Sequence, residues 1–223
     1  MKLIKRVLVK LAYLYKVFVL RDPHFLNVRR WFKDFGCDTF NLDYPLNASS
    51  LVLDVGGYLG DYADAVSKKF GCRVILFEPI PSFYDACVTR FSGNSSIVCL
   101  NYGLSSVSGN FSISVSDNAS SFKTQSTNDY VCLAEVRSFK EVICELGIND
   151  VDLVKINIEG GEYDLLPSMI ESGLINQVRF LQIQFHNFVE GAVENRQRIR
   201  KLLEKTHRQM WNYEFVWESW ERL

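Results

Sequence analysis

The residues best suited to chemistry form a glycine-rich turn directly after a short apolar run. Leu51–Val55 is apolar except for Asp54, and it leads into Gly56, Gly57 and, three residues further on, Gly60. Glycines at such a point let the backbone turn sharply and leave the first amides of a following helix free for an anion. We therefore predict that this turn holds either a pyrophosphate or the carboxylate of an amino acid.

Two details of the turn favour the carboxylate. Asp54 would repel a pyrophosphate, whereas it would attract the cationic end of an amino-acid-like ligand. The glycines are spaced G-G-x-x-G, so the G-x-G-x-x-G pattern of dinucleotide-binding proteins is not met.

Polar residues also end the next two apolar runs. Glu78 follows Val74–Phe77 about 20 residues after the turn, where an acid accepts hydrogen bonds from ribose hydroxyls, and Pro79 ends that strand. The alternative is a solvated acid at a strand end. Asn101 follows Ile97–Leu100 and either borders an adenine ring or simply forms a turn.

A fourth run carries an unusual polar set. Within and just after Leu153–Ile158, alternation puts Lys155, Asn157 and Glu159 on one side, with Glu162 close behind. Buried polar groups need partners or a task. The structural alternative is a salt bridge between Lys155 and Glu159.

A histidine ends the fifth run, Val178–Phe185. His186 beside strand-end carboxylates is a candidate general base, although a lone histidine is as often structural. Gln182 and Gln184 alternate with it and are expected to point inward.

The runs that carry these residues have the length and β-branched content of strands buried on both faces. Between them the sequence predicts helices over Tyr62–Phe70, Ser82–Phe91, Glu162–Ser172 and Ala192–Thr206. This alternation indicates a doubly wound α/β fold with a mostly parallel sheet and helices on both faces. Phe111–Ser116 alternates at period two and predicts a hairpin arm or edge strand, followed by a loop over Asp117–Asn128.

Composition limits the remaining possibilities. The chain has 223 residues, is 48% hydrophobic and carries a formal charge of -1, which suits one domain and gives no overall bias toward nucleic acid. Its six cysteines are scattered without a C-x-x-C pair or a histidine at ligand spacing, so we expect no metal site and no disulfide framework.

The N-terminus is basic. Residues 1–20 contain five lysines and arginines among apolar residues. These charges interrupt any stretch that could span a membrane or form a secretory signal, so we expect a cytoplasmic protein. We interpret this segment as a helix packed on the domain, with peripheral contact to the inner membrane face as the alternative. Near the C-terminus, aromatic residues over Trp211–Trp217 and at Trp220 either stack on a sugar or, as we prefer, form core.

Together these segments resemble the FkbM family of S-adenosylmethionine-dependent methyltransferases. The most specific part is Asp152–Glu162, D-L-V-K-I-N-I-E-G-G-E, which is similar to the family signature D-L-x-K-I-D-V-E-G-x-E. The glycine turn, Phe77–Pro79 and Asn101–Ser105 follow in the family's order. The resemblance implies a Rossmann-like class I methyltransferase domain over residues 46–223, preceded by a basic helical extension over residues 1–45.

The resemblance also implies roles for the polar residues. Those expected to hold S-adenosylmethionine are Asp54, Gly56, Gly57, Tyr58, Gly60, Glu78, Asn101 and Asn157. The expected catalytic residues are Glu159, His186 and Glu162. Asn157 departs from the family's aspartate, which argues against a base or strong metal ligand there.

The implied activity is methylation of a sugar hydroxyl in a glycan or glycan precursor. One alternative is an NAD-dependent oxidoreductase or epimerase of a nucleotide sugar, which the glycine spacing disfavours. Another is a non-catalytic cofactor-binding protein at a membrane surface.

Overall fold

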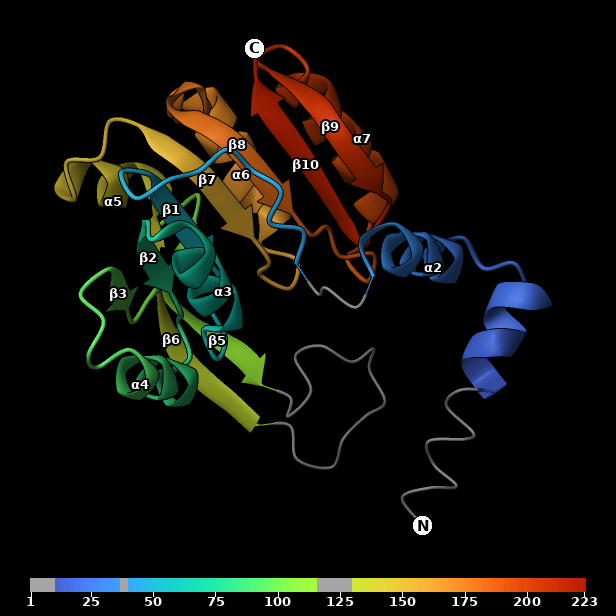
Figure 1. The fold of residues 1–223 in the computed structure, drawn as a ribbon, viewed down its shortest axis with the longest axis horizontal. Coiled ribbons are helices and arrows are strands. Elements are labelled where there is room, and N and C mark those ends of the chain that lie inside the picture. The colour runs from blue at the N-terminus through green and yellow to red at the C-terminus, as the bar shows by residue number, and fades with distance from the viewer. Residues whose placement is uncertain (1–10, 37–39, 116–129) are drawn as a thin grey trace.

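A seven-stranded sheet forms the centre of the computed structural model, which describes residues 11–36, 40–115 and 130–223 (Figure 1). The strand order is β3-β2-β1-β7-β8-β10-β9, and all neighbours are parallel except those of β10. The strands are β1 (Leu51–Val55), β2 (Arg73–Phe77), β3 (Ile97–Leu100), β7 (Val151–Ile156), β8 (Val178–Ile183), β9 (His207–Tyr213) and β10 (Trp217–Arg222).

Helices cover both faces of this sheet, as Figure 1 shows. They are α3 (Asp61–Phe70), α4 (Pro81–Arg90), α5 (Phe139–Glu145), α6 (Glu162–Glu171), α7 (Ala192–Leu203) and the short 3-10 helix η1 (Leu174–Gln177). Alternate side chains of β1 enter opposite cores: Val52 packs with residues of α3, whereas Leu53 packs with residues of α5, α6 and α7. The predicted doubly wound fold is therefore confirmed.

A second, three-stranded sheet contains β4 (Gly103–Ser105), β5 (Gly109–Val115) and β6 (Tyr130–Ser138) in the order β4-β6-β5. β5 pairs antiparallel with β6 at the edge of this sheet, which confirms the strand predicted from the alternation at Phe111–Ser116 up to Val115. The loop predicted over Asp117–Asn128 lies outside the described residues.

Some predicted boundaries were wrong. β7 ends at Ile156 rather than Ile158, and β8 ends at Ile183 rather than Phe185. After β7 the backbone leaves the sheet because Glu159 and Gly160 adopt positive φ angles of 52° and 106°. The last helix ends at Leu203, before the predicted Thr206.

The C-terminal aromatic residues belong to the core. Trp220 lies on β10 and is fully buried, and Tyr213 and Trp217 are nearly so. Their burial agrees with the core interpretation and is incompatible with stacking on a sugar.

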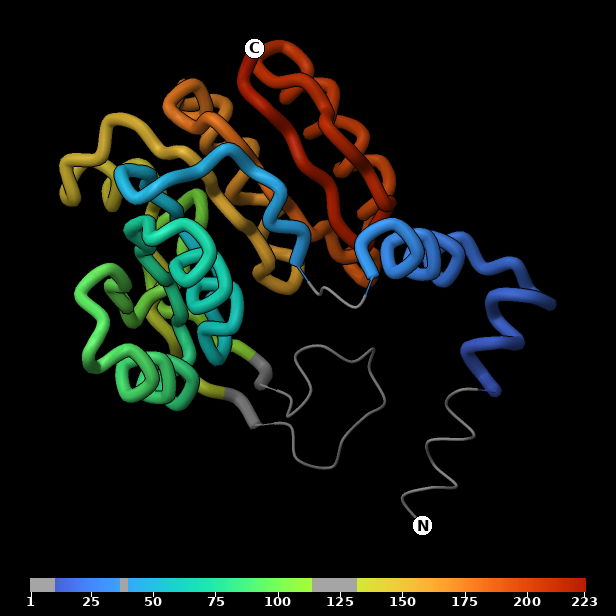
Figure 2. Tube along the Cα trace, in the orientation of Figure 1, coloured from blue at the N-terminus to red at the C-terminus, as the bar shows by residue number. Residues whose placement is uncertain are grey.

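The N-terminal extension contacts the domain through α2 (Pro23–Phe35), whose first turn is capped by the carboxylate of Asp22. Trp31 of α2 is buried against Trp211 and Tyr213 of β9. Residues 40–50 then cross one face of the main sheet to reach β1, as the chain path in Figure 2 shows. Among the described residues, no helix is long and apolar enough to cross a bilayer.

Candidate active site

The topology defines where a ligand binds to this sheet. From β1 the chain moves toward β2 and β3, whereas β7 and β8 lie on the other side of β1. Such a switch point opens a crevice beyond the carboxyl ends of the strands. We call that side of the sheet the carboxyl edge. Two turns meet there: the first turn, residues 56–60 after β1, and the second turn, residues 157–161 after β7.

The first turn has no space for side chains at its glycines. A Cβ atom on Gly56 would lie 2.0 Å from the backbone oxygen of Asn157, and one on Gly57 would lie 2.3 Å from Leu76. On Gly60 it would lie 2.6 Å from Phe91. Gly56 and Gly60 also have positive φ angles, of 85° and 80°. The predicted glycine cradle is therefore a requirement of both packing and backbone conformation.

Asp54 points into the protein rather than into the crevice. Its carboxylate is fully buried and lies 2.8 Å from the ammonium of Lys155, which also donates to the carbonyl of Gly56 at 2.6 Å. Burial raises the pKa of Asp54, and Lys155 opposes the rise. The alternative salt bridge of Lys155 with Glu159 is wrong, because Lys155 lies beside β1. The Asp54–Lys155 pair instead fixes the start of the first turn.

This ion pair belongs to a polar row that crosses four strands in register. Asp54 is paired with Lys155, Lys155 with Gln182, and Gln182 with Ser219. The hydroxyl of Tyr62 donates to Gln182 at 2.9 Å, and Tyr44 lies 2.9 Å from Ser219. Gln182 is therefore inward-pointing, as predicted, and is bound to a helix over the sheet.

Glu78 closes the first turn from the neighbouring strand. Its carboxylate accepts the backbone N–H of Tyr58 at 2.7 Å and that of Ile80 at 2.9 Å. Burial raises the pKa of Glu78 to about 7, although these two hydrogen bonds oppose the rise. Each oxygen still has a lone pair for a ligand hydroxyl. The Asn101 side chain donates to the carbonyls of Glu78 and Pro79, so it holds the ends of β2 and β3 together.

The second turn is held by another buried carboxylate. Glu162 is fully buried and accepts the backbone N–H of Gly160 at 2.9 Å and that of His186 at 2.8 Å. Its Oε1 also lies 3.0 Å from Nδ1 of His186. Tyr163 donates to the carbonyl of His186 at 2.8 Å. The imidazole is thus fixed by Glu162, and the backbone of His186 is held by both Glu162 and Tyr163 of α6.

The other ring nitrogen of His186 faces Glu159. Nε2 lies 3.8 Å from Oε1 of Glu159, whose side chain is largely exposed at a φ of 52°. Burial lowers the pKa of His186, but the hydrogen bond and charge of Glu162, with the charge of Glu159, raise it above its ordinary value overall. A histidine held at Nδ1 by a buried carboxylate can accept a proton at Nε2.

Asn157 contributes mainly through its backbone. Its N–H donates to the carbonyl of Val55 at 3.0 Å, and its own carbonyl packs against Gly56. The predicted site residues of the two turns therefore lie in contact.

Sequence reasoning missed Phe188. Its ring is 55% exposed and its centroid lies 5.4 Å from that of His186. The neighbouring Val189 packs on Gly160: a Cβ atom added to Gly160 would lie 2.8 Å from Cγ2 of Val189. An aromatic residue two positions after a strand-end histidine was the available signal.

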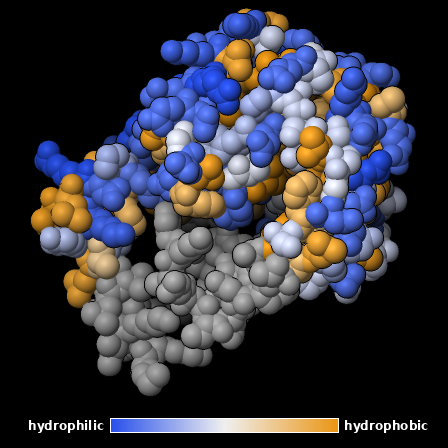
Figure 3. All heavy atoms as spheres, turned by 180° about the vertical axis from the view of Figure 1, so that it is seen from behind, coloured by the Kyte–Doolittle hydropathy of each residue, from blue (hydrophilic) through white to orange (hydrophobic). Residues whose placement is uncertain are grey.

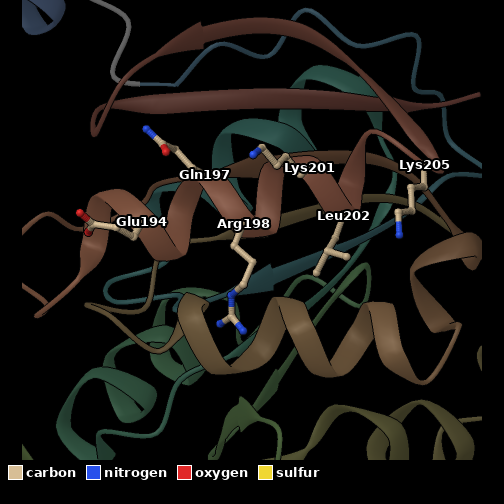
Figure 4. A pocket seen from close by; sticks show the side chains of 6 residues that line it. All are labelled: Glu194, Gln197, Arg198, Lys201, Leu202 and Lys205. Atoms are coloured by element: carbon tan, nitrogen blue, oxygen red, sulfur yellow. The ribbon is translucent and has the colours of Figure 1, made fainter.

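Other surfaces offer less chemistry. Among the described residues, no group of three or more histidine, cysteine and carboxylate side chains is arranged to hold a metal ion. A hollow along α7 contains none of the predicted site residues. Its lining, drawn in Figure 4, consists of Glu194, Gln197, Arg198, Lys201, Leu202 and Lys205.

The cradle fits the amino-acid part of S-adenosylmethionine, because it approaches a ligand with backbone alone, and Glu78 lies where ribose hydroxyls would bind. This fold and site define a class I, Rossmann-like methyltransferase domain that uses S-adenosylmethionine. The chain belongs to the family described as the methyltransferase FkbM domain, whose model matches residues 54–215. The alternative of an NAD-dependent oxidoreductase is therefore wrong.

Similar proteins were also found individually. The chain is 28% identical over 142 residues to the hexuronic acid methyltransferase AglP of Haloferax volcanii, a match that covers 61% of this chain and 56% of that protein. The chain thus spans little more than half the length of this relative. Among solved structures, Aeropyrum pernix fibrillarin with bound S-adenosyl-L-methionine is 12% identical with a TM-score of 0.48, covering 82% of this chain and 70% of that one. An rRNA methylase from Streptococcus thermophilus is also 12% identical with a TM-score of 0.48, covering 80% and 89%.

Proposed function

We propose that this protein transfers a methyl group from S-adenosylmethionine to a hydroxyl oxygen of a sugar in a glycan or glycan precursor. The observation that carries the proposal is the Glu162–His186 pair at the carboxyl edge. It leaves Nε2 of a fixed imidazole 3.8 Å from Glu159 of the second turn, which packs against the first turn through Asn157 and Gly56. A hydroxyl is a poor nucleophile until its proton is removed, so O-methylation is the reaction that such a base serves.

The cofactor would be held by the first turn and its neighbours. The backbone of Gly56, Gly57, Tyr58 and Gly60 forms the cradle, Glu78 accepts the ribose hydroxyls, and Asn101 and Asn157 border the site. Asp54 acts indirectly, because it holds Lys155 against the carbonyl of Gly56. When bound, S-adenosylmethionine supplies an activated methyl group on a sulfonium.

The chain's own residues act on the acceptor. Glu159 binds and orients the hydroxyl, and Nε2 of His186 takes its proton as the oxygen forms its bond to the methyl carbon. The bound cofactor would supply the methyl carbon and keep the electron pair of the carbon–sulfur bond as a neutral thioether, and Glu162 would stabilise the imidazolium of His186. Because the methyl donor is already activated, positioning contributes more than proton transfer to the rate.

Two observations support a sugar acceptor. The exposed ring of Phe188 beside His186 offers an apolar face on which the C–H groups of a sugar can stack. The similar AglP of Haloferax volcanii is named as a hexuronic acid methyltransferase. The proposal includes peripheral contact with the inner membrane face through residues 1–20, supported by the charge of that segment.

The test is to incubate the purified protein with methyl-labelled cofactor and the glycan fraction of its host. We expect label in the glycan fraction, and loss of that label with His186→Ala although cofactor binding remains normal. Label found in protein or lipid alone would overturn the sugar acceptor. Full activity of His186→Ala would remove this residue from the mechanism.

A further inference from the structure

A stripe of apolar side chains lies exposed on the N-terminal extension. Residues 11–18 are helical, and four of them recur at the spacing of one helix face. They are Leu11, Leu14, Tyr15 and Phe18, with exposed fractions of 56%, 37%, 54% and 60%. The opposite side of the helix is attached: Val17 is buried, and the ring of Tyr13 lies 5.8 Å from that of Phe25 in α2. The stripe is therefore held outward.

The extension is basic in sequence. Residues 1–45 contain nine lysines and arginines and four acidic residues, a formal charge of +5. The remaining 178 residues contain 16 basic and 22 acidic residues, a formal charge of -6. Figure 3 shows hydrophobic and hydrophilic side chains side by side on the extension, at the left of that view. This charge separation favours an anionic partner for the extension specifically.

The extension is anchored at the carboxyl edge. β9 runs in the same direction as β8, because both are antiparallel to β10, so its last residue, Tyr213, lies at the edge where β7 and β8 end. Trp31 of α2 packs on Tyr213, with ring centroids 5.4 Å apart. The side chain of Asn27 reaches the carbonyl of Glu214 just beyond β9. A surface bound by the extension would therefore lie toward the active edge of the domain.

We infer that the extension docks the protein on an anionic phospholipid bilayer, with the apolar stripe of residues 11–18 inserted among the lipids. Arg29 of α2, whose guanidinium lies 4.8 Å from the ring centroid of Phe18, would contact the headgroups beside the stripe. An apolar stripe flanked by positive charge is the arrangement with which interfacial helices bind such surfaces. This inference rests on the membrane contact included in the proposed function and deepens it, since it names the residues that insert and the class of lipid that they bind.

The test is flotation of the full chain with vesicles of phosphatidylcholine, with and without phosphatidylglycerol. We expect binding to the anionic vesicles only, weakened by added salt. The double variant Leu14→Ser, Phe18→Ser should bind the anionic vesicles about tenfold more weakly or worse. The matched variant Val107→Ser, at an exposed apolar residue outside the extension, should bind as the unmodified chain does.

Equal cofactor affinity and equal circular dichroism in all variants would show that each has folded. Unchanged flotation of the double variant would overturn the inference. A second result would also overturn it: the unmodified chain binds RNA but no vesicles at the same salt concentration, and the double variant still binds RNA. The extension would then serve a nucleic acid. Absence of methyl transfer to the glycan fraction by the unmodified chain would count against the proposed function and leave the docking result intact.

Discussion

The two turns at the carboxyl edge are built alike and differ in what lies next to them. Each contains a non-glycine residue at a left-handed φ, Tyr58 at 49° and Glu159 at 52°, a conformation that costs about 1 kcal/mol. Each is closed by a buried carboxylate that accepts a backbone N–H of the turn: Glu78 for the first and Glu162 for the second. Strain of this kind is concentrated at functional sites.

The difference lies in the second partner of each carboxylate. Glu78 accepts another backbone N–H, from Ile80, and its burial raises its pKa to about 7. Glu162 instead accepts the backbone N–H of His186 and contacts the ring of the same residue. Glu78 is thus available as a hydrogen-bond acceptor for a ligand, whereas Glu162 positions the ring of His186. We assign cofactor binding to the first turn and acceptor chemistry to the second.

The largest expected effect is on turnover, and it comes from replacing His186, the proposed base beside the second turn. His186→Gln should lower turnover about 10²–10⁴-fold and leave cofactor affinity unchanged, because the proton acceptor is lost while the cradle is intact. Turnover with labelled cofactor and calorimetric titration measure the two quantities. His207→Gln is the control, since His207 is buried and bonded to the carbonyl of Val178, so it should lose stability rather than chemistry. Weaker cofactor binding by His186→Gln would contradict the assignment of cofactor binding to the first turn alone.

The contact between the turns is tested by Gly56→Ala. The new Cβ would meet the carbonyl of Asn157 at 2.0 Å at a φ of 85°, so the free energy of unfolding should fall by about 3 kcal/mol. Denaturant titration measures the loss, and cofactor affinity should fall with it. Gly93→Ala is the matched control, because a Cβ there has no heavy atom within 4 Å. Equal stability of the two variants would mean that the turns are not packed together.

The positioning role of the second carboxylate is tested by Glu162→Gln. Turnover should fall about 10–100-fold, since the imidazole loses the group that orients it. The pKa of His186 should also drop, because a carboxylate that favours the protonated ring is gone, and the pH–rate profile should move to lower pH. Glu171→Gln, at the far end of α6, should behave as the unmodified chain. An unmoved profile would indicate a merely structural glutamate.

The smallest expected effect concerns pH and the first turn. The folded state holds the Glu78 proton more tightly than the unfolded state, so its contribution to stability is present below pH 4.5 and is lost as pH rises to about 7. Cofactor affinity should change in the opposite direction, because ribose hydroxyls donate to the ionised carboxylate. Calorimetry between pH 6 and 8 should show affinity rising by at most about tenfold per pH unit. Glu78→Gln should flatten this dependence, and a flat profile in the unmodified chain would argue against the assignment.

Much of this arrangement was predictable from the sequence, for physical reasons. β1 to β3 are short, apolar and β-branched, and a polar residue or glycine follows each, so periodicity and composition gave both the strands and the edge. The partner of Lys155 was not predictable, because whether a strand residue faces Asp54 or Glu159 depends on the register between β1 and β7. The sequence pattern contains no signal for that register.

The same limit applies to the role of Glu162. Its position three residues after Glu159 on the chain predicts proximity to the edge, but its burial arises from the packing of α6 against the chain after β8. β9 and β10 were interpreted only as aromatic core, because their strands carry polar residues that are neutralised by α7: Arg196 pairs with Glu218 at 2.6 Å. Such compensation is visible only in three dimensions.

The most direct test of the division of labour compares Glu78→Ala with Glu162→Gln in one pair of assays. Calorimetry gives the cofactor affinity, and a single-turnover experiment at saturating cofactor gives the rate of methyl transfer. We predict that Glu78→Ala abolishes measurable cofactor binding, whereas Glu162→Gln binds the cofactor normally and transfers the methyl group slowly. Equal losses of affinity in both variants, or unchanged affinity in Glu78→Ala, would contradict the account.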